Sequence, residues 1–333
     1  MRAAVVDEPG QVRVSDVADP VPGPGQVVVE VGACGICGTD LHIAAGEFPP
    51  TPYPIVPGHE FAGRVVGVGP DVVTGIRTGD RVAVDPSLFC GYCAPCRAGR
   101  GNLCANWGAT GDTVDGAFAE LVAVPATNAY ALPDHLTWQQ GALVEPLSCA
   151  VHGVRRLGVG VDEQVLVVGA GTMGLLLLQL LLRGGARVAV VDRNPARLPL
   201  AEKLGAAVVA TSVAELDDTF TAAVDVTGAA PAIEDAFAAL GRGGRLMIFG
   251  VAPAEATVRL SPFRIYNDEI TVLGSMAVLH SFGTALDLMA TGAVETSSLL
   301  THGLPLEEFP QALDLVRAGD GVKVQILPSG GAG

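Results

Sequence analysis

The first 147 residues carry short runs in which apolar and polar positions alternate. These runs occupy residues 27–33, 62–69, 80–86 and 117–125, and turn sequences such as PGPG separate them. Alternation with a period of two is typical of strands that have one face in a core. Residues 1–147 are therefore predicted to form a mostly β domain.

The pattern changes at about residue 148. The apolar strand sequence QVLVV leads into a glycine turn, a helical run of leucines, and then the strand sequence ARVAVVD. Continuously apolar strands that alternate with helices indicate βαβ units and a parallel sheet covered on both faces. Residues 148–274 are predicted to be this second domain, in a protein of the α/β class. Residues 275–333 are too short to stand alone and are predicted to pack back on the first domain.

Charge and composition limit the classes of molecule that the protein is expected to bind. The chain has 20 basic and 35 acidic residues, a net charge of −15. This balance disfavours nucleic acids and anionic membranes, because no basic patch is available to neutralise phosphates. Glycines interrupt the most apolar run at 165–182, and the N-terminus lacks a signal-peptide core. We therefore expect a cytoplasmic protein with no membrane partner, in which clustered cysteines bind metal rather than form disulfides.

Four cysteines lie close together in the sequence, with the spacing C-x2-C-x2-C-x7-C. Thiolates are preferred ligands of structural zinc, and four of them complete a tetrahedral coordination sphere. A filled sphere leaves no position for water or substrate, so the cluster predicts a structural zinc site in a lobe at about residues 86–106. The expected ligands are Cys90, Cys93, Cys96 and Cys104.

A second set of candidate ligands is scattered along the first domain. A catalytic zinc site uses mixed nitrogen, oxygen and sulfur ligands and keeps one position open. Cys37, His59 and a carboxylate would meet that need, although a lone histidine in a glycine-flanked turn is often structural. The three segments that hold the candidates contain Cys37, Thr39, Asp40 and His42, then His59 and Glu60, then Glu145, Cys149 and His152.

The glycine turn at 169–174 reads G-x-G-x-x-G between a strand and a helix, and the next strand ends in Asp192. This context predicts a dinucleotide site, with the pyrophosphate at the helix N-terminus and Asp192 on the adenosine ribose. The carboxylate favours NAD over NADP, while the adjacent Arg193 keeps NADP as the less favoured option. The alternative to a dinucleotide site is an ordinary glycine turn in a parallel-sheet domain. The expected contacts are Gly169, Gly171, Thr172, Met173, Gly174, Asp192 and Arg193, with Thr227, Phe249, Gly250 and Ser275 at the nicotinamide end.

Several motifs then occur in a characteristic order: GICGTDLH, YPIVPGHEFAGRVVGVG, the four-cysteine lobe, DGAFAELVAVP, GALVEPLSCAVHG and VLVVGAGTMG. Together they resemble the zinc-dependent medium-chain dehydrogenase/reductase family. More narrowly, the chain is similar to the branch of sorbitol, other polyol, 2,3-butanediol and threonine dehydrogenases. The resemblance implies a GroES-like β domain completed by the C-terminal segment, a doubly wound Rossmann domain, and an active site between them.

The resemblance also implies roles for individual residues. Cys37 and His59 match the constant ligands of the catalytic zinc, and Glu60 matches the carboxylate ligand of the polyol branch. Glu145 matches a glutamate at or near the metal, and which glutamate binds directly stays open. Thr39 matches the hydroxyl that relays the alcohol proton, and His42 matches an outer relay group. Cys149 is kept as an alternative ligand near Glu145, and the four-cysteine lobe matches the structural zinc site.

The expected function is transfer of a hydride from a secondary alcohol of a polyol or sugar alcohol to NAD, which gives a ketone. Threonine, a vicinal diol or a cyclitol is the alternative substrate within the same family. A non-catalytic zinc or NAD(H)-binding protein is the alternative from another class, and metal content separates the two: about two zinc ions per chain indicate the enzyme, and about one a structural role. The family resemblance further implies a homo-oligomer, with a tetramer favoured over a dimer.

Overall fold

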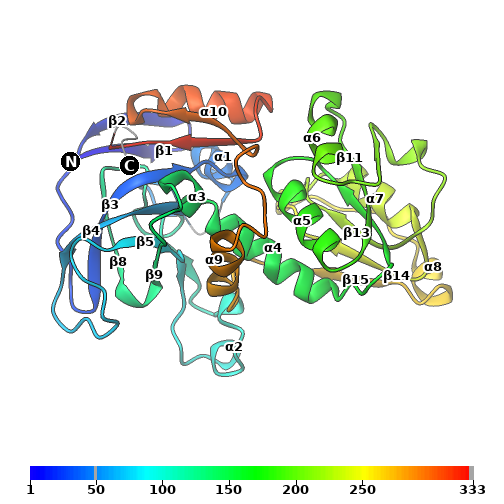
Figure 1. Cartoon of the computed structure of the whole chain (residues 1–333), viewed down its shortest axis with the longest axis horizontal. Coiled ribbons are helices and arrows are strands. Elements are labelled where there is room, and N and C mark those ends of the chain that lie inside the picture. The colour runs from blue at the N-terminus through cyan, green and yellow to red at the C-terminus, as the bar shows by residue number, and fades with distance from the viewer. Residues whose placement is uncertain (49–50, 330–333) are drawn as a thin grey trace. The chain divides into compact units, whose positions relative to one another are not determined.

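The computed structural model describes residues 1–48 and 51–329, and its chain divides into two compact units. Unit 1 contains residues 1–148 and 278–333, and unit 2 contains residues 149–277. The last segment of the chain therefore belongs with the first, as the colours of Figure 1 show. The helix α4 (Val144–Leu157) contains the boundary at Ser148, so the change in sequence pattern falls inside one continuous helix.

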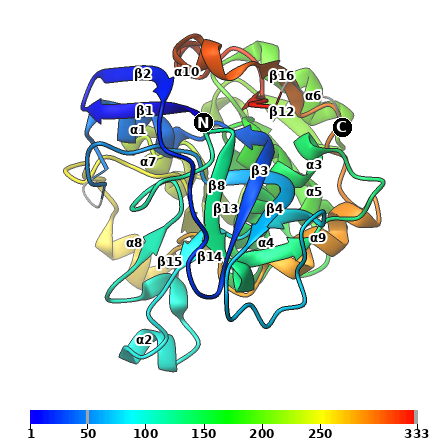
Figure 2. The same cartoon turned by 90° about the vertical axis from the view of Figure 1, so that its left-hand side faces the viewer.

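Unit 1 is built around a seven-stranded sheet with the order β16-β17-β3-β4-β5-β9, in which β8 pairs with β3. Its strands are β3 (Gln26–Gly35), β4 (Glu60–Val68), β5 (Arg81–Val84), β8 (Leu121–Pro125), β9 (Ala129–Ala131), β16 (Leu300–Leu304) and β17 (Lys323–Ile326). Figure 2 looks onto β3, β4 and β8. The core beside the sheet includes Phe118 and Phe309, whose ring centroids lie 4.6 Å apart. This contact joins the first and last parts of the chain in one core.

Smaller elements surround this sheet. β1 (Arg2–Glu8) and β2 (Gln11–Asp16) form an antiparallel hairpin, and β6 (Ser87–Leu88) pairs with β7 (Gly108–Ala109). The chain between β6 and β7 forms the lobe that carries α2, which projects from the rest of unit 1 in Figures 1 and 2. The helices are α1 (Gly38–Ala45), α2 (Ala94–Arg97), α3 (Trp138–Ala142), α9 (Phe282–Ala290) and α10 (Phe309–Ala318).

Unit 2 has a six-stranded parallel sheet with the order β12-β11-β10-β13-β14-β15. The order reverses at β10, which is the pattern of a doubly wound dinucleotide-binding sheet. The predicted α/β class with a parallel sheet is thus confirmed. The elements are β10 (Gln164–Val168), α5 (Thr172–Arg183), β11 (Arg187–Val191), α6 (Leu198–Lys203), β12 (Val208–Ala210), β13 (Phe220–Asp225), α7 (Ala230–Ala238), β14 (Leu240–Ile248), α8 (Pro262–Asn267) and β15 (Thr271–Gly274).

Both faces of this sheet are covered, which explains its continuously apolar strands. Leu166 and Val168 of β10 pack in one cluster with Phe237 of α7, whereas the intervening Val167 is equally buried and belongs to the other face. Leucines of α5 such as Leu175 and Leu178 are fully buried as well. Across residues 1–48 and 51–329, no helix is both long and apolar enough to cross a membrane.

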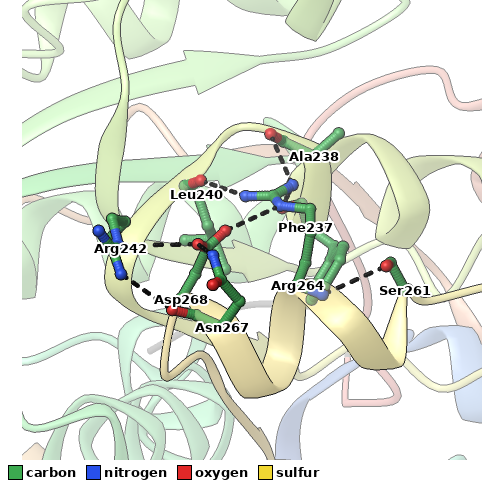
Figure 3. A network of polar contacts seen from close by, with 8 residues as sticks. All are labelled: Phe237, Ala238, Leu240, Arg242, Ser261, Arg264, Asn267 and Asp268. Carbon is green, nitrogen blue, oxygen red and sulfur yellow. Dashed lines mark hydrogen bonds and ion pairs between the residues drawn. The ribbon is translucent and has the colours of Figure 1, made fainter.

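Arg264 of α8 ties the end of α7 to the strand that follows it (Figure 3). Its guanidinium donates to the carbonyl oxygens of Phe237 and Ala238, both at 3.3 Å, and of Leu240 at 2.7 Å. Phe237 and Ala238 lie in the last turn of α7, where the carbonyl oxygens lack their usual partner four residues on, and Leu240 is the first residue of β14. The same side chain pairs with Asp268 at 3.3 Å and lies over the ring of Phe237. Arg264 therefore holds α7, β14 and α8 together at one corner of unit 2.

Candidate metal centre and nucleotide site

Three ligand types meet where β3 ends and β4 begins. Cys37, His59 and Glu60 each offer one atom, and these atoms all lie within 4.8 Å of one another. Cys37 is the N-cap of α1, two residues after the end of β3, and Glu60 is the first residue of β4. Because the antiparallel register places Gly35 opposite Glu60, residues more than twenty positions apart become neighbours. A sulfur, a nitrogen and an oxygen donor are thus assembled by one strand pair.

His59 lies between two buried carboxylates. Its Nδ1 atom is 3.1 Å from Asp112 Oδ1 and 3.8 Å from Asp40 Oδ1. Burial alone would lower the pKa of His59, but the negative charges of Asp112 and Asp40 outweigh it, and the pKa is raised well above its usual range. Burial raises the pKa of Asp40 to about 7. The two carboxylates therefore favour positive charge at this point of the structure.

One buried cation stands beside these acidic groups. Lys323 of β17 forms an ion pair with Glu60 and donates to the carbonyl oxygen of Ile36 at 2.9 Å. Burial alone would lower the pKa of Lys323. The negative charges of Glu60 and the neighbouring groups have the larger effect, so the pKa is raised overall. Gly35 leaves room for this pair, because a Cβ there would displace the Glu60 carboxylate and the Lys323 side chain. The sequence did not indicate Lys323 as part of this site.

The donor set fits zinc. Thiolate, imidazole and carboxylate are its usual protein ligands, and three of them leave the fourth position of a tetrahedron for another group. Several polar atoms around the cluster also lack hydrogen-bond partners among the described residues, among them His59 Nδ1, Asp40 Oδ1 and Asp112 Oδ1. Such buried, unsatisfied atoms are costly unless a further group organises them. Residues 37, 59 and 60 are therefore a candidate catalytic metal centre.

The two expected relay residues lie on α1, beside this centre. Thr39 Oγ1 is 3.8 Å from Cys37 Sγ. His42 lies one turn further along the helix, where its Nδ1 contacts Glu47 Oε2 at 2.8 Å. Glu145 is buried in the first turn of α4, but it is not part of the three-residue ligand group in the described structure. The structure therefore brings Glu60, rather than Glu145, to Cys37 and His59.

The four cysteines of the lobe form a second ligand group. Cys90, Cys93, Cys96 and Cys104 offer sulfur atoms that all lie within 4.8 Å of one another. Backbone N–H groups point at these sulfurs: Cys90 donates to Cys104 at 3.3 Å, and Asn106 donates to it at 3.2 Å. Burial would raise the pKa of Cys90, but N–H donation from Tyr92 and Cys93 lowers it to about 6. Four preformed sulfur donors fit a closed structural metal site.

The glycine turn of unit 2 has the geometry expected of a phosphate-binding turn. Gly169 has a φ of +114°, and a Cβ on Gly174 would collide with the carbonyl oxygen of Gly169, so both positions require glycine. Thr172 and Met173 begin α5, with Gly171 as its N-cap. The backbone N–H groups of this first turn point out of the helix and carry the positive end of its dipole. They form a site suited to a pyrophosphate.

Asp192 follows β11, beside this turn. Its carboxylate accepts hydrogen bonds from the backbone N–H of Ala170 at 2.7 Å and of Asn194 at 2.8 Å. Arg197 lies 3.7 Å from the same carboxylate, whereas Arg193 is exposed. Asp192 is thus fixed at the edge of the glycine turn, with two arginines close to it in sequence.

The remaining nucleotide residues follow the ends of β13, β14 and β15. Thr227 follows β13, Phe249 and Gly250 follow β14, and Ser275 follows β15. The fully buried Asp225, which the sequence did not indicate, organises this region: it accepts hydrogen bonds from Thr227 Oγ1 at 2.6 Å and from Gly228 N at 2.9 Å. The strand ends therefore meet at one edge of the sheet, where doubly wound folds bind nucleotides.

Comparison with known proteins places this fold in one class. Residues 23–134 match the sequence family of the alcohol dehydrogenase GroES-like domain, and residues 172–291 match the zinc-binding dehydrogenase family. The chain is 34% identical to D-arabinitol dehydrogenase 1 of Uromyces fabae, over 99% of this chain and 97% of that protein. It is 37% identical to D-altritol 5-dehydrogenase of Agrobacterium fabrum, over 86% and 87%.

A solved structure agrees with these matches. The crystal structure of a zinc-binding dehydrogenase from Sinorhizobium meliloti, bound to NADP, has a TM-score of 0.93 and 36% identity, and the match covers 98% of this chain and 99% of that one. The fold and site thus define a zinc-binding, nicotinamide-dependent oxidoreductase. The chain belongs to the zinc-dependent medium-chain dehydrogenase/reductase family.

Proposed function

We propose that the protein oxidises a secondary hydroxyl of a polyol or sugar alcohol to a ketone, with NAD as hydride acceptor. The observation that carries the proposal is the mixed donor group of Cys37, His59 and Glu60, which would hold one catalytic zinc. The dehydrogenases of D-arabinitol and D-altritol named above support a polyol as substrate. The four-cysteine lobe would hold a second, structural zinc.

The residues around the centre would perform the following steps. When bound, zinc supplies a Lewis acid that lowers the pKa of the substrate hydroxyl. Thr39 can both accept and donate a proton, and it lies beside the Cys37 thiol. The imidazole of His42 can both accept and donate a proton, and it would pass the proton outwards with Glu47 as its partner. Overall, a secondary alcohol and NAD⁺ give a ketone, NADH and one proton.

For the nicotinamide cofactor, we favour NAD over NADP. The support is Asp192, whose carboxylate is held beside the glycine turn by Ala170 and Asn194. A 2′-phosphate on the adenosine ribose would bring negative charge against this carboxylate. The positive charges of Arg193 and Arg197 reduce that repulsion, and the related crystal structure contains NADP. We therefore expect the protein to use both cofactors and to prefer NAD.

A substrate panel tests the proposal. The zinc-loaded protein would be assayed for NADH formation with polyols, cyclitols, vicinal diols, L-threonine and simple primary alcohols. We expect the highest kcat/KM for a secondary hydroxyl next to a second hydroxyl on a polyol chain. Cys37→Ser is the matched control that removes a zinc ligand and leaves unit 2 unchanged. Turnover of primary alcohols alone would contradict the proposal, and a preference for threonine, a diol or a cyclitol would select the alternative substrate.

We also propose that the protein is a homo-oligomer, and favour a tetramer over a dimer. β15 lies at the end of the strand order in unit 2, and Val272 on it is 38% exposed. The preceding α8 exposes Phe263 by 68% and Tyr266 by 82%. A free strand edge beside exposed aromatic rings is suited to pairing with a second copy. Light scattering after size exclusion would give the mass, and Val272→Lys should shift it towards the monomer.

A cytoplasmic location completes the proposal. All seven cysteines of the described structure are free thiols. Five of them belong to the two groups of candidate metal ligands, and Cys34 is buried in the core. Zinc ligation by thiolates requires that they stay reduced, which the cytoplasm provides. Fractionation of the native cells, followed by an activity assay of each fraction, would test the location.

A further inference from the structure

Metal-binding histidines need a second partner. When one ring nitrogen binds a metal, the other donates its proton to a carboxylate or carbonyl that fixes the tautomer and the ring plane. Two carboxylates face Nδ1 of His59, namely Asp40 at 3.8 Å and Asp112 at 3.1 Å. Only the shorter distance lies within hydrogen-bonding range. The question is which of them orients the histidine.

Asp40 already has a structural task. Its Oδ2 atom accepts a hydrogen bond from the backbone N–H of Cys37 at 2.8 Å, as part of the capping box that begins α1. This bond fixes the carboxylate at the helix end and satisfies an N–H that the helix leaves free. Asp40 is thereby held next to Cys37, at a distance too long to bind His59 directly.

Asp112 is free of such a task. It is 6% exposed, and its Oδ1 atom has no hydrogen-bond partner among the described residues, although His59 Nδ1 lies 3.1 Å away. Removing an ionised carboxylate from water is costly unless a donor or a positive charge faces it. The imidazole of His59 is the group at the right distance. Asp112 is also outside the three-residue ligand group, so it stands behind the histidine rather than among the ligands.

The backbone builds this placement. Gly111 has a φ of +88°, and a Cβ there would collide with the carbonyl oxygen of Gly58, the residue before His59. A Cβ on Gly116 would strike the same oxygen. Backbone hydrogen bonds then fasten the loop to this segment, from Gly116 N to Val56 O at 2.7 Å and from Ala117 N to Gly58 O at 2.9 Å. The loop therefore carries Asp112 against His59 through backbone contacts rather than through a flexible side chain.

We propose that Asp112 is the positioning residue for His59: it accepts the Nδ1 proton and leaves Nε2 for the metal. This inference rests on the metal-centre part of the proposed function. It also gives the four-cysteine lobe a connection to that centre. Asp112 lies three residues after the end of β7, the strand that closes the lobe by pairing with β6. The lobe thus stands at the base of the loop that orients a catalytic ligand.

The first test compares metal affinity in three variants of the full chain. Asp112→Asn keeps the shape but replaces a pure acceptor with an amide that also donates, so the tautomer preference is weakened. Asp115→Asn is the matched control: it lies on the same loop, is exposed, and accepts from Val56 N rather than facing His59. Asp40→Asn tests the competing carboxylate. Zinc affinity of the catalytic centre would be measured by chelator competition, and Co²⁺ substitution would report the ligand field through the visible spectrum.

We expect Asp112→Asn to weaken zinc binding at the catalytic centre about 10- to 100-fold and to shift the Co²⁺ spectrum. Asp115→Asn should stay within about twofold of the unaltered protein. The inference is overturned if Asp112→Asn keeps both the affinity and the spectrum, or if only Asp40→Asn loses them. If the unaltered protein binds a single zinc, in the four-cysteine lobe alone, the proposed function fails instead.

A second test needs no substitution at Asp112. The unaltered, zinc-loaded protein would be labelled with ¹⁵N-histidine, and the His59 signals would be assigned with His59→Gln. Because the two ring nitrogens differ in chemical shift, the spectrum shows which one carries the proton and which binds the metal. We expect a protonated Nδ1 and a metal-bound Nε2. The opposite arrangement would refute the role of Asp112, even if every variant at that position failed to fold.

Discussion

The ammonium group of Lys323, on the last strand of the chain, forms a buried ion pair with the carboxylate of Glu60, a candidate zinc ligand. Lys323 is 3% exposed and Glu60 is 2% exposed, so neither charge is screened by water. The lysine is further held by the carbonyl of Ile36, a residue 287 positions earlier in the chain. The Glu60 carboxylate that would bind zinc thus already interacts with the ammonium group of Lys323.

This pairing predicts that replacement of Lys323 depends on metal. Lys323→Met leaves Glu60 as an uncompensated buried charge, which costs about 3–5 kcal/mol of stability in the metal-free protein. Bound zinc would supply the missing positive charge, so the loss should be markedly smaller in the zinc-loaded protein. Urea unfolding of both forms would measure the difference. Lys203→Met, at an exposed position in the last turn of α6, is the control, and a loss at Lys323 that zinc does not reduce would speak against Glu60 as a ligand.

Metal content distinguishes the two ligand groups. Cys37→Ser removes a ligand of the open centre, so we expect about one zinc per chain, no turnover, and little change in thermal stability. Cys93→Ser opens the four-cysteine site, so the chain should also lose one zinc, but with a clear fall in Tm because the lobe loses its crosslink. Elemental analysis and calorimetry would measure both. Cys149→Ser should keep two zinc ions. Loss of the catalytic zinc in that variant would indicate that Cys149 is a ligand after all.

The ligand types and the nucleotide turn could be predicted from the sequence because each is encoded in a short motif. Cys37, His59 and Glu60 stand in two such motifs, and the register of β3 with β4 brings them together. Asp112 and Lys323 could not be found in this way. One stands in a loop without ligand spacing and the other in a short strand at the chain end, and only the glycine contacts and the β17–β3 pairing carry them to the centre.

The same reasoning applies to unit 2. The G-x-G-x-x-G turn predicts a phosphate site because glycine is required at particular backbone positions, and Gly169 and Gly174 have that role in the structure. Asp225 gave no signal, because an aspartate at the end of an apolar strand is also common in surface turns. Its function follows only from burial and from its bonds to Thr227 and Gly228. Local patterns thus indicated the sites, whereas the groups that organise them required the fold.

Asp192 provides a test of cofactor choice. Asp192→Ala removes the negative charge that opposes a 2′-phosphate, and it leaves Arg193 and Arg197 close to that position. We expect the ratio of kcat/KM for NAD to kcat/KM for NADP to fall by about tenfold or more, which corresponds to about 1.4 kcal/mol. Steady-state kinetics with both cofactors would measure it. Asp217→Ala, an exposed aspartate of the same unit, should leave the ratio unchanged, and an equal ratio in both variants would show that Asp192 does not select the cofactor.

Arg264 predicts a stability effect far from the chemistry. Arg264→Met keeps much of the apolar stem but removes the donor to Leu240 O and to the carbonyls at the end of α7 (Figure 3). Leaving such carbonyls unpaired costs about 1–3 kcal/mol, so unfolding of unit 2 should shift by that amount. Arg242→Met is the matched control: its side chain is 79% exposed, and it contacts Asp268 at 3.7 Å and donates to the exposed carbonyl oxygen of Asn267 at 3.0 Å, so we expect a change within about 0.5 kcal/mol. Urea unfolding followed by near-ultraviolet circular dichroism would compare them. Equal losses in the two variants would mean that the bonds of Arg264 contribute no more than the exposed contacts of Arg242.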